Sequence, residues 1–283
     1  MISLSLNHKN GSMMNNVIYL LTIILIPIFH NALKAQDYFT WPNGAKAAVS
    51  LTYDDGIDTQ LDIAIPDLNR AGLTGTFYLQ GDNLTPERID QWRSAANNGH
   101  ELGNHSIFHP CLSSHDFVWE EFASEDYTIR RMIKELSVMN NILYSLDGKE
   151  GPRTYAYTCS ETEVGKESII DSLKASGLFV GARGGGSGVV SDFKQLNIFN
   201  VPSMTTVEGT ANDMIPFIKQ AGDEGGLAVF MFHGVGGDYL NISREDHQEV
   251  LDYLNKNKGT YWTATFSQII GHIKRERQRL GWE

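Results

Sequence analysis

The chain has 283 residues, 41% of them hydrophobic, and a formal net charge of −11 from 23 basic and 34 acidic residues. A protein this acidic is a poor partner for nucleic acid or for an anionic membrane surface. The length suits one large domain with a substantial core, and no internal repeat or low-complexity segment divides the chain.

The first 35 residues contain no acidic side chain and include an almost unbroken apolar run over residues 17–29. This run is shorter than the roughly 20 residues of a membrane span. The small residue Ala35 suits cleavage before Gln36. We therefore interpret residues 1–35 as a secretory signal peptide and residues 36–283 as the mature domain, secreted or periplasmic, with no membrane contact after cleavage. An uncleaved N-terminal anchor is the alternative.

After this leader, short apolar segments alternate with amphipathic ones. This order favours parallel strands joined by right-handed crossovers. Strands are predicted at residues 47–51, 74–79, 100–103, within 151–159, and at 178–182, 226–232 and 261–263. Helices are predicted at residues 61–72, 85–98 (Thr85 as N-cap), 119–143, 168–177, 213–221, 243–257 (Ser243 as N-cap) and 266–276.

Two adjacent carboxylates, Asp54 and Asp55, stand where the first strand would end, and Gly56 follows them. Adjacent carboxylates repel each other, and burying both is costly unless a metal ion or an arginine offsets the charge. The alternative is a solvated Asp-Gly turn.

Two histidines, His105 and His109, follow the third predicted strand. Their spacing lets both imidazoles face one point and is frequent among metal ligands. In a parallel sheet the carboxyl ends of the strands share one edge, where α/β folds keep their chemistry. The Asp pair and the His pair are therefore expected on the same edge, with open positions for water and substrate.

A third polar cluster begins at His233, which follows the apolar strand 226–232 and precedes a glycine. A histidine there is either structural or part of the same edge, and the two clusters already on that edge favour the second interpretation. The glycine-rich segment 184–188 lacks the Gly-Lys-Ser/Thr ending of a phosphate-binding loop, so a flexible loop is predicted.

At this point the chain resembles the polysaccharide deacetylases with a NodB-like domain, carbohydrate esterase family 4, over about residues 44–272. Residues 52–56 (TYDDG) are similar to the first motif of that family. Residues 105–110 (HSIFHP) are similar to its second motif, and residues 232–234 (FHG) to its last. Three motifs in the family's order are much more specific than any one of them.

The resemblance implies a distorted (β/α) barrel, often with seven parallel strands, that removes acetyl groups from sugars with one divalent metal. Asp55, His105 and His109 would be the ligands, with zinc first and cobalt, nickel or manganese as alternatives. Asp54 would be the general base, and His233 the general acid that protonates the leaving amine or alkoxide. This chemistry is sound on its own terms, because a metal lowers the pKa of water and a nearby carboxylate can accept the proton.

The middle motifs depart from the family pattern. The third is commonly Arg-x-x-Tyr-Gly, and residues 153–157 read RTYAY here. By the resemblance Arg153 would hold Asp54, and the backbone of Tyr157 would serve the oxyanion. The motif whose aspartate orients the acid histidine has no clear counterpart, and Asp192 and Asp213 are its candidates.

Cys111 and Cys159 each follow one of these motifs. In a secreted protein two cysteines suggest one disulfide, and two free buried thiols are the alternative. They are not expected to bind the metal, because the Asp-His-His set is already complete.

The expected partner is an acetylated glycan, either N-acetylated or O-acetylated. The sequence does not predict the oligomeric state of the protein. A catalytically silent glycan-binding module on the same fold is the main alternative, and the retained Asp54 and His233 argue against it. A non-haem iron oxygenase is a third possibility, because two histidines and one carboxylate can form its triad. Sugar rings could stack on aromatic side chains near the site: Phe108, Trp119, Tyr239 and Trp262.

Overall fold

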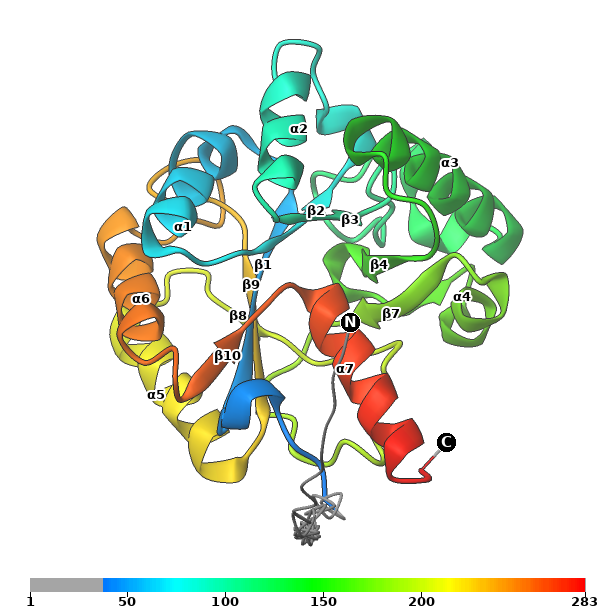
Figure 1. Ribbon diagram of the computed structural model, residues 1–283. Helices are drawn as coiled ribbons and strands as arrows, with labels where there is room; N and C mark the ends of the chain where they lie inside the picture. Colours follow the sequence, from blue (N-terminus) through cyan, green and yellow to red (C-terminus); the bar gives the residue numbers. More distant parts are fainter. Residues whose placement is uncertain (1–37, 283) are drawn as a thin grey trace, which may run out of the picture. The chain divides into compact units, whose positions relative to one another are not determined.

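The architecture is a curled parallel sheet surrounded by helices, seen in a computed structural model that describes residues 38–282 (Figure 1). The predicted leader at residues 1–35 lies outside the described residues. Seven strands follow one another in the order β7-β4-β3-β2-β1-β9-β8, and an eighth, β10, pairs with the first residues of β1. The strands are β1 (Ala47–Asp55), β2 (Thr76–Leu79), β3 (Glu101–Asn104), β4 (Arg153–Ala156), β7 (Phe179–Arg183), β8 (Met204–Thr205), β9 (Leu227–Phe232) and β10 (Tyr261–Thr263).

Every strand pair in this sheet is parallel, so the carboxyl ends of all strands meet at one edge. The described strands β7 and β8 end the path, and between them the chain before β8 pairs with β7 through a single isolated parallel bridge, Arg183 with Val201. The predicted (β/α) barrel of about seven parallel strands is confirmed. A small antiparallel hairpin, β5 (Glu163–Val164) and β6 (Glu167–Ser168), lies apart from the sheet.

Helices pack around the outside of the sheet, as Figure 1 shows. β1 is buried along its whole length because helices and neighbouring strands cover both of its faces. Val49, Leu51 and Tyr53 belong to one core cluster, and the residues between them take the other face. The helices are α1 (Ile65–Ala71), α2 (Ile89–Asn97), α3 (Ile129–Asp147), α4 (Ile170–Ser176), α5 (Ala211–Glu224), α6 (Arg244–Lys256) and α7 (Phe266–Arg279).

Two predicted helix starts are wrong. α2 begins at Ile89 and not after Thr85, whose carbonyl instead accepts from the Arg88 N–H in a turn. The helix predicted from residue 119 begins at Ile129, where the Thr128 side chain caps it by accepting from Arg131 N–H. Residues 119–127 form short 3-10 turns, because contacts with distant residues hold them in an irregular segment.

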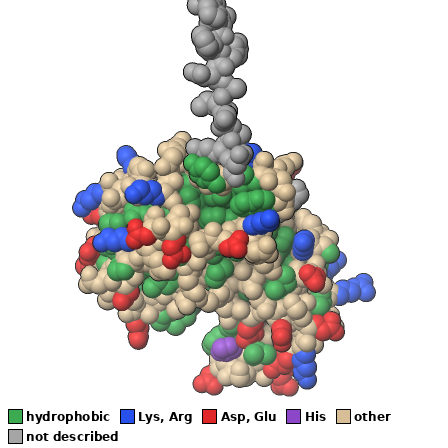
Figure 2. Space-filling model, turned by 90° about the horizontal axis from the view of Figure 1, so that it is seen from below, with side chains coloured by type: hydrophobic (Ala, Val, Ile, Leu, Met, Phe, Trp, Pro, Cys, Tyr) green, Lys and Arg blue, Asp and Glu red, His purple; other side chains and the backbone are tan. Residues whose placement is uncertain are grey.

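Other predicted boundaries hold. Gly72 ends α1 in the left-handed conformation, and the Ser243 side chain caps α6 by accepting from Asp246 N–H. No helix in the range 38–282 is long and apolar enough to cross a membrane. On the face shown in Figure 2, acidic and basic side chains are interspersed among hydrophobic ones.

Candidate metal centre and active site

The site begins at the end of β1, where Asp54 and Asp55 are both almost fully buried. Neighbouring residues of a regular strand point to opposite faces. Asp55, however, has a positive φ of 78°, and Gly56 after it has 71°, so the backbone turns sharply at this point. Both carboxylates consequently come near His105, whose Nε2 lies 3.9 Å from Asp54 Oδ2 and 3.3 Å from Asp55 Oδ1.

The two histidines come from the turn that follows β3. His105 Nδ1 lies 2.9 Å from the carbonyl oxygen of Ala156, so a proton on Nδ1 leaves Nε2 free to face Asp55. His109 has a positive φ of 50°, and its Nε2 lies 3.5 Å from Asp55 Oδ1. Glu135 of α3 holds the turn by accepting from the N–H groups of Ile107 and Phe108, at 3.1 Å each.

Asp55, His105 and His109 fit a divalent metal. Their donor atoms all lie within 4.8 Å of one another. Ligands about 2.1 Å from a tetrahedral ion stand about 3.4 Å apart, close to the 3.3 and 3.5 Å separations from Asp55 Oδ1 to the imidazole nitrogens. Asp55 Oδ1 is buried and has no hydrogen-bond partner among residues 38–282. The structure thus brings the three predicted ligands together. The unpartnered Asp55 Oδ1 faces the Nε2 atoms of both histidines.

The electrostatics of these groups follow from burial and from one another. Burial alone would raise the pKa of Asp55, but the imidazoles of His105, His109 and His233 together hold it well below its usual range. Burial, with the neighbouring His105, lowers the pKa of His109 to about 4. For Asp55 and His109 these shifts favour the ionised carboxylate and the neutral imidazole, the forms that bind a metal. Burial alone would lower the pKa of His105, but the carboxylates of Asp54 and Asp55 raise it above its usual value.

Asp54 is held by an arginine, but not by the predicted one. Arg183, fully buried at the end of β7, donates to Asp54 Oδ2 and, at 3.1 Å, to Ser203 Oγ. Arg153 stands at the opposite end of β4, where it forms an ion pair with Asp147 at 2.8 Å. The prediction that Arg153 holds Asp54 is therefore wrong.

His233 follows β9 and points toward the same cluster, with its Nε2 3.9 Å from Asp55 Oδ2. The buried Gln60 side chain fixes the backbone on both sides by donating to the carbonyls of Asp54 and of His233, the latter at 3.2 Å. His233 Nδ1 has no hydrogen-bond partner in the described part of the chain.

Neither candidate for orienting His233 is placed to do so. Asp192 accepts from the backbone N–H groups of Lys194 and Gln195, and Asp213 forms the capping box of α5 with Thr210. Both aspartates are therefore ruled out as partners of His233, and both serve local turns instead.

Two tyrosines line the site in different ways. The backbone N–H of Tyr157 donates to the carbonyl of Arg183 at 3.1 Å. The prediction that this N–H serves an oxyanion is therefore wrong. The Tyr157 hydroxyl donates to the carbonyl of Phe199 at 2.7 Å. Tyr239 donates to Asp55 Oδ2 at 2.9 Å while half of its side chain remains exposed. No motif in the sequence predicts this contact.

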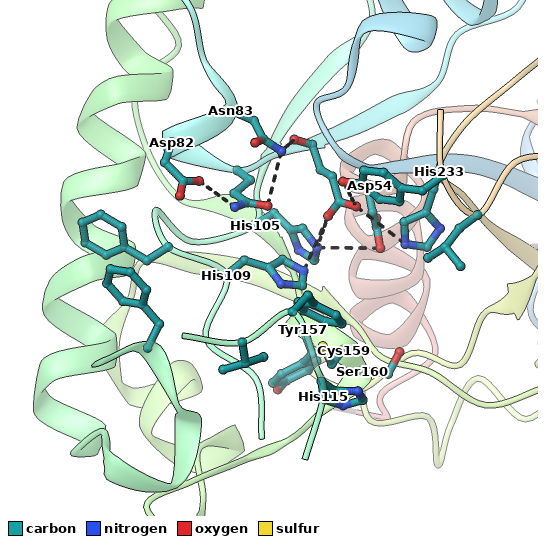
Figure 3. A pocket seen from close by; sticks show the side chains of 18 of the residues that line it. Asp54, Asp82, Asn83, His105, His109, His115, Tyr157, Cys159, Ser160 and His233 are labelled. Carbon is teal, nitrogen blue, oxygen red and sulfur yellow. Dashed lines mark hydrogen bonds and ion pairs between the residues drawn. The ribbon is translucent and has the colours of Figure 1, made fainter. Parts of the chain in front are cut away.

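A cavity of about 1030 Å³ opens above this cluster. Asp54, His105, His109 and His233 converge at its floor, as the close view in Figure 3 shows. The size lies near the upper end of the range of about 300–1,000 Å³ that is typical of ligand pockets. The wall comes from several other parts of the chain: residues 80–83, the segment 108–122, residues 157–160, residues 205–207 with Met231, and residues 239 and 240.

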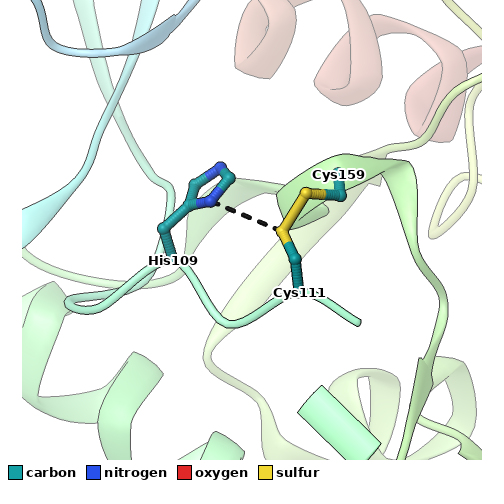
Figure 4. A group of neighbouring side chains, drawn as sticks. All are labelled: His109, Cys111 and Cys159. Atoms are coloured by element: carbon teal, nitrogen blue, oxygen red, sulfur yellow. Dashed lines mark hydrogen bonds between the residues drawn. A yellow bond between two sulfur atoms is a disulfide. The ribbon is translucent and has the colours of Figure 1, made fainter. Parts of the chain in front are cut away.

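A disulfide between Cys111 and Cys159 joins the loop after the second motif to the loop after β4 (Figure 4). This confirms the predicted pairing. Cys111 Sγ lies 3.5 Å from His109 Nδ1, so the bridge contacts one of the candidate ligands directly. Both sulfurs are bonded to each other, so these cysteines offer no thiolate to a metal, as expected.

The fold and the site define a parallel α/β half-barrel with a carboxylate-histidine centre at the carboxyl ends of its strands. Residues 40–178 match the family model described as polysaccharide deacetylase. The chain belongs to the polysaccharide deacetylase family, as its motifs predicted.

Two curated relatives match part of the chain. A peptidoglycan-N-acetylglucosamine deacetylase of Bacillus cereus is 33% identical over 100 residues, which cover 34% of this chain and 32% of that protein. The peptidoglycan-N-acetylmuramic acid deacetylase PdaA of Bacillus subtilis is 25% identical over 122 residues, which cover 43% of this chain and 41% of that protein. The match thus spans about a third to two fifths of the length of these relatives.

Solved structures share the fold at low identity. A proposed polysaccharide deacetylase from Mycobacterium smegmatis has a TM-score of 0.60 at 17% identity, over 84% of this chain and 94% of its own. A family 4 acetyl xylan esterase from Clostridium thermocellum, in complex with a cobalt ion, has a TM-score of 0.51 at 18% identity, over 79% and 90%. A mutant of a CE4 family pseudoenzyme also has a TM-score of 0.51, at 15% identity over 80% and 67%.

Proposed function

We propose that this chain is a secreted, metal-dependent hydrolase that removes N-linked or O-linked acetyl groups from a carbohydrate. The observation that carries the proposal is the convergence of Asp55, His105 and His109 on one point, with Asp54 and His233 beside them at the floor of a large cavity. The family membership of the chain and the names of its curated relatives support the choice of reaction.

Asp55, His105 and His109 would hold one divalent cation, with zinc as the first choice because one carboxylate and two imidazoles are donors that zinc accepts. Such a cation lowers the pKa of a water and polarises a carbonyl oxygen when bound. The contact of His105 Nδ1 with the Ala156 carbonyl keeps its Nε2 directed at the centre.

Asp54 would accept the proton of the attacking water. Its Oδ2 accepts from Arg183, while its Oδ1 is buried without a partner among residues 38–282 and is therefore the oxygen available to the proton. The guanidinium of Arg183 offsets the negative charge of the base in its buried setting.

His233 would give a proton to the leaving amine or alkoxide, because it lies across the centre from the turn that carries the two histidine ligands. The contact of Gln60 with both the Asp54 and the His233 carbonyls fixes the spacing between the base and the acid. Such fixed spacing lowers the cost of reaching the reactive arrangement.

The test is acetate release by the purified protein, with and without chelator, and after addition of zinc, cobalt, nickel or manganese. The panel contains N-acetylglucosamine oligomers, peptidoglycan and acetylated xylan. Chelator-sensitive release from at least one glycan is expected. No release from any of them, with a full equivalent of metal bound, would favour a silent glycan-binding module.

Two variants test the assignment of roles. Asp54→Asn should retain the metal and lose at least 100-fold in kcat, since a positioned base contributes about 10²–10⁴. The matched control is Asp171→Asn on the exposed face of α4, which should keep normal turnover. His105→Ala should lose the metal, and a full equivalent of metal in that variant would contradict the ligand set.

Secretion has its own test. Expression in a host with a secretory pathway should yield a protein in the medium or periplasm whose first residue is Gln36. A membrane-bound product that begins at the original N-terminus would instead support the uncleaved anchor.

A further inference from the structure

The segment 108–122 forms the outer wall of the cavity, and most of its side chains that line the cavity are apolar or aromatic. Phe117 and Trp119 are 61% and 71% exposed although they line it. Phe108 and Phe122 stack on each other, with ring centroids 4.7 Å apart, and also line the cavity. Exposed aromatic faces at a ligand cavity favour a ligand that presents flat apolar surface, as a sugar ring does with its C–H face.

This wall is held in place before any ligand binds. The disulfide anchors its beginning at Cys111, and Glu161 accepts from the Leu112 N–H at 3.0 Å and from Ser124 Oγ at 3.1 Å. A wall that is already ordered loses little conformational entropy when it binds a ligand. The affinity of the cavity for a ligand therefore depends mainly on how well that ligand matches the aromatic and charged side chains of the wall.

Away from the histidines and the proposed metal at the floor, the charged side chains that line the cavity are acidic. Asp82 and Glu121 line it and are exposed, and no lysine or arginine of the described residues lines it. The hydrogen-bond partner of Asp82 is the neutral amide of Gln80, at 2.6 Å. The side chain of Glu121 forms no ion pair among residues 38–282, whereas Asp54 at the floor is balanced by Arg183.

We propose that the cavity selects uncharged acetylated glycans and discriminates against glycans that carry carboxylate groups, such as those with N-acetylmuramic acid or uronic acid residues. The inference rests on the proposed function and narrows its substrate class. A carboxylate on the bound chain, away from the proposed metal at the floor, would meet Asp82 and Glu121 with no lysine or arginine among the lining residues to pair with. Like charges at an interface cost affinity for the wrong partner. The aromatic wall, by contrast, needs no charge on the sugar.

The experiment compares matched substrates with the purified full-length protein loaded with metal. One pair is an N-acetylglucosamine oligomer and an oligomer of equal length in which N-acetylmuramic acid alternates with N-acetylglucosamine. The second pair is acetylated xylan with and without glucuronic acid side groups. For each pair from which the protein releases acetate, we expect kcat/KM to favour the uncharged member about tenfold at low salt. This preference should shrink as salt screens the carboxylates of Asp82 and Glu121.

The variant Asp82→Asn/Glu121→Gln should lower this preference about tenfold by improving kcat/KM for the carboxylated substrate. The control Glu245→Gln/Glu249→Gln removes two charges from exposed positions on α6 that do not line this cavity, and it should leave the preference unchanged. A preference for the carboxylated substrate would overturn the inference. So would a preference that neither salt nor the first variant changes.

Binding measurements separate this inference from the proposed reaction. Calorimetric titration of the Asp54→Asn variant with each oligosaccharide reports selection without turnover. If no glycan releases acetate but the uncharged oligosaccharide still binds about tenfold more tightly, the reaction is wrong and the selectivity stands. If acetate is released and both members of a pair bind equally, the reaction stands and the selectivity is wrong.

Discussion

The ion pair between Arg183 and Asp54 gives a sharp test of how the candidate base is held. Both side chains are buried, with 0% and 3% of their surface exposed. Removing one partner of such a pair typically costs about 3–5 kcal/mol, because a buried charge is left without compensation. Arg183→Met should therefore destabilise the metal-free protein by about 3–5 kcal/mol.

Most of this loss should vanish when Asp54 is neutral. In the background Asp54→Asn, the same Arg183→Met substitution removes only the bond to Ser203 and leaves no isolated carboxylate, so it should cost about 1–2 kcal/mol. The difference is a coupling energy of about 2 kcal/mol. Arg183→Lys keeps the charge and provides a milder variant in case the methionine variant does not fold.

The assay is urea unfolding of the four proteins of the cycle in the presence of chelator. Arg153 provides the matched control, because it is also a buried arginine in an ion pair, with Asp147. Arg153→Met should destabilise the protein, yet its coupling to Asp54→Asn should stay below about 0.5 kcal/mol. A coupling near zero for Arg183, or a larger one for Arg153, would refute this account of the site.

Three further expectations follow from the structure. Cys111→Ser/Cys159→Ser opens a loop that spans 48 residues, which should lower the unfolding free energy by about 4 kcal/mol, and it should weaken metal binding about tenfold because the bridge contacts His109. His247 is buried beside the Tyr53 hydroxyl, and burial lowers its pKa to about 4. Since the unfolded chain binds a proton near pH 6.5, stability should be full above that pH and fall by about 3 kcal/mol toward pH 4, and His247→Gln should lose less over the same range. Equal pH dependence in the two proteins would show that His247 is not the responsible group. Addition of chelator should lower the melting temperature of the metal-loaded wild type but not that of His105→Ala, because a metal bound only to the folded state stabilises it.

The sheet was predictable because its signal is local. Short apolar segments ended at turn residues, and their alternation with amphipathic segments required parallel strands whose polar residues share one edge. The structure accordingly brings Asp55, His105 and His109 to one point from two strand ends. Their roles as ligands remain predictions for the metal measurements above.

The wall of the cavity was less predictable because long-range contacts determine it. Residues 119–127 have enough charged and apolar residues to favour a helix, yet they fold as short turns. The bonds that hold this region reach Glu161 and Cys159, about 40 residues along the chain, and no local window contains both ends of such a bond. Tertiary contacts therefore outweighed the local preference.

The choice of arginine could have been made from strand direction. Arg153 opens β4, so in a parallel sheet it must lie at the amino edge, away from the carboxylates that end β1. The register pairs Ala156 with Arg183, and His105 contacts the carbonyl of that same Ala156. An arginine that ends a strand can reach the edge where a buried carboxylate needs a counter-charge, whereas one that begins a strand cannot. The position of a residue along a parallel strand is therefore a stronger guide to the partner of Asp54 than the spacing of a motif.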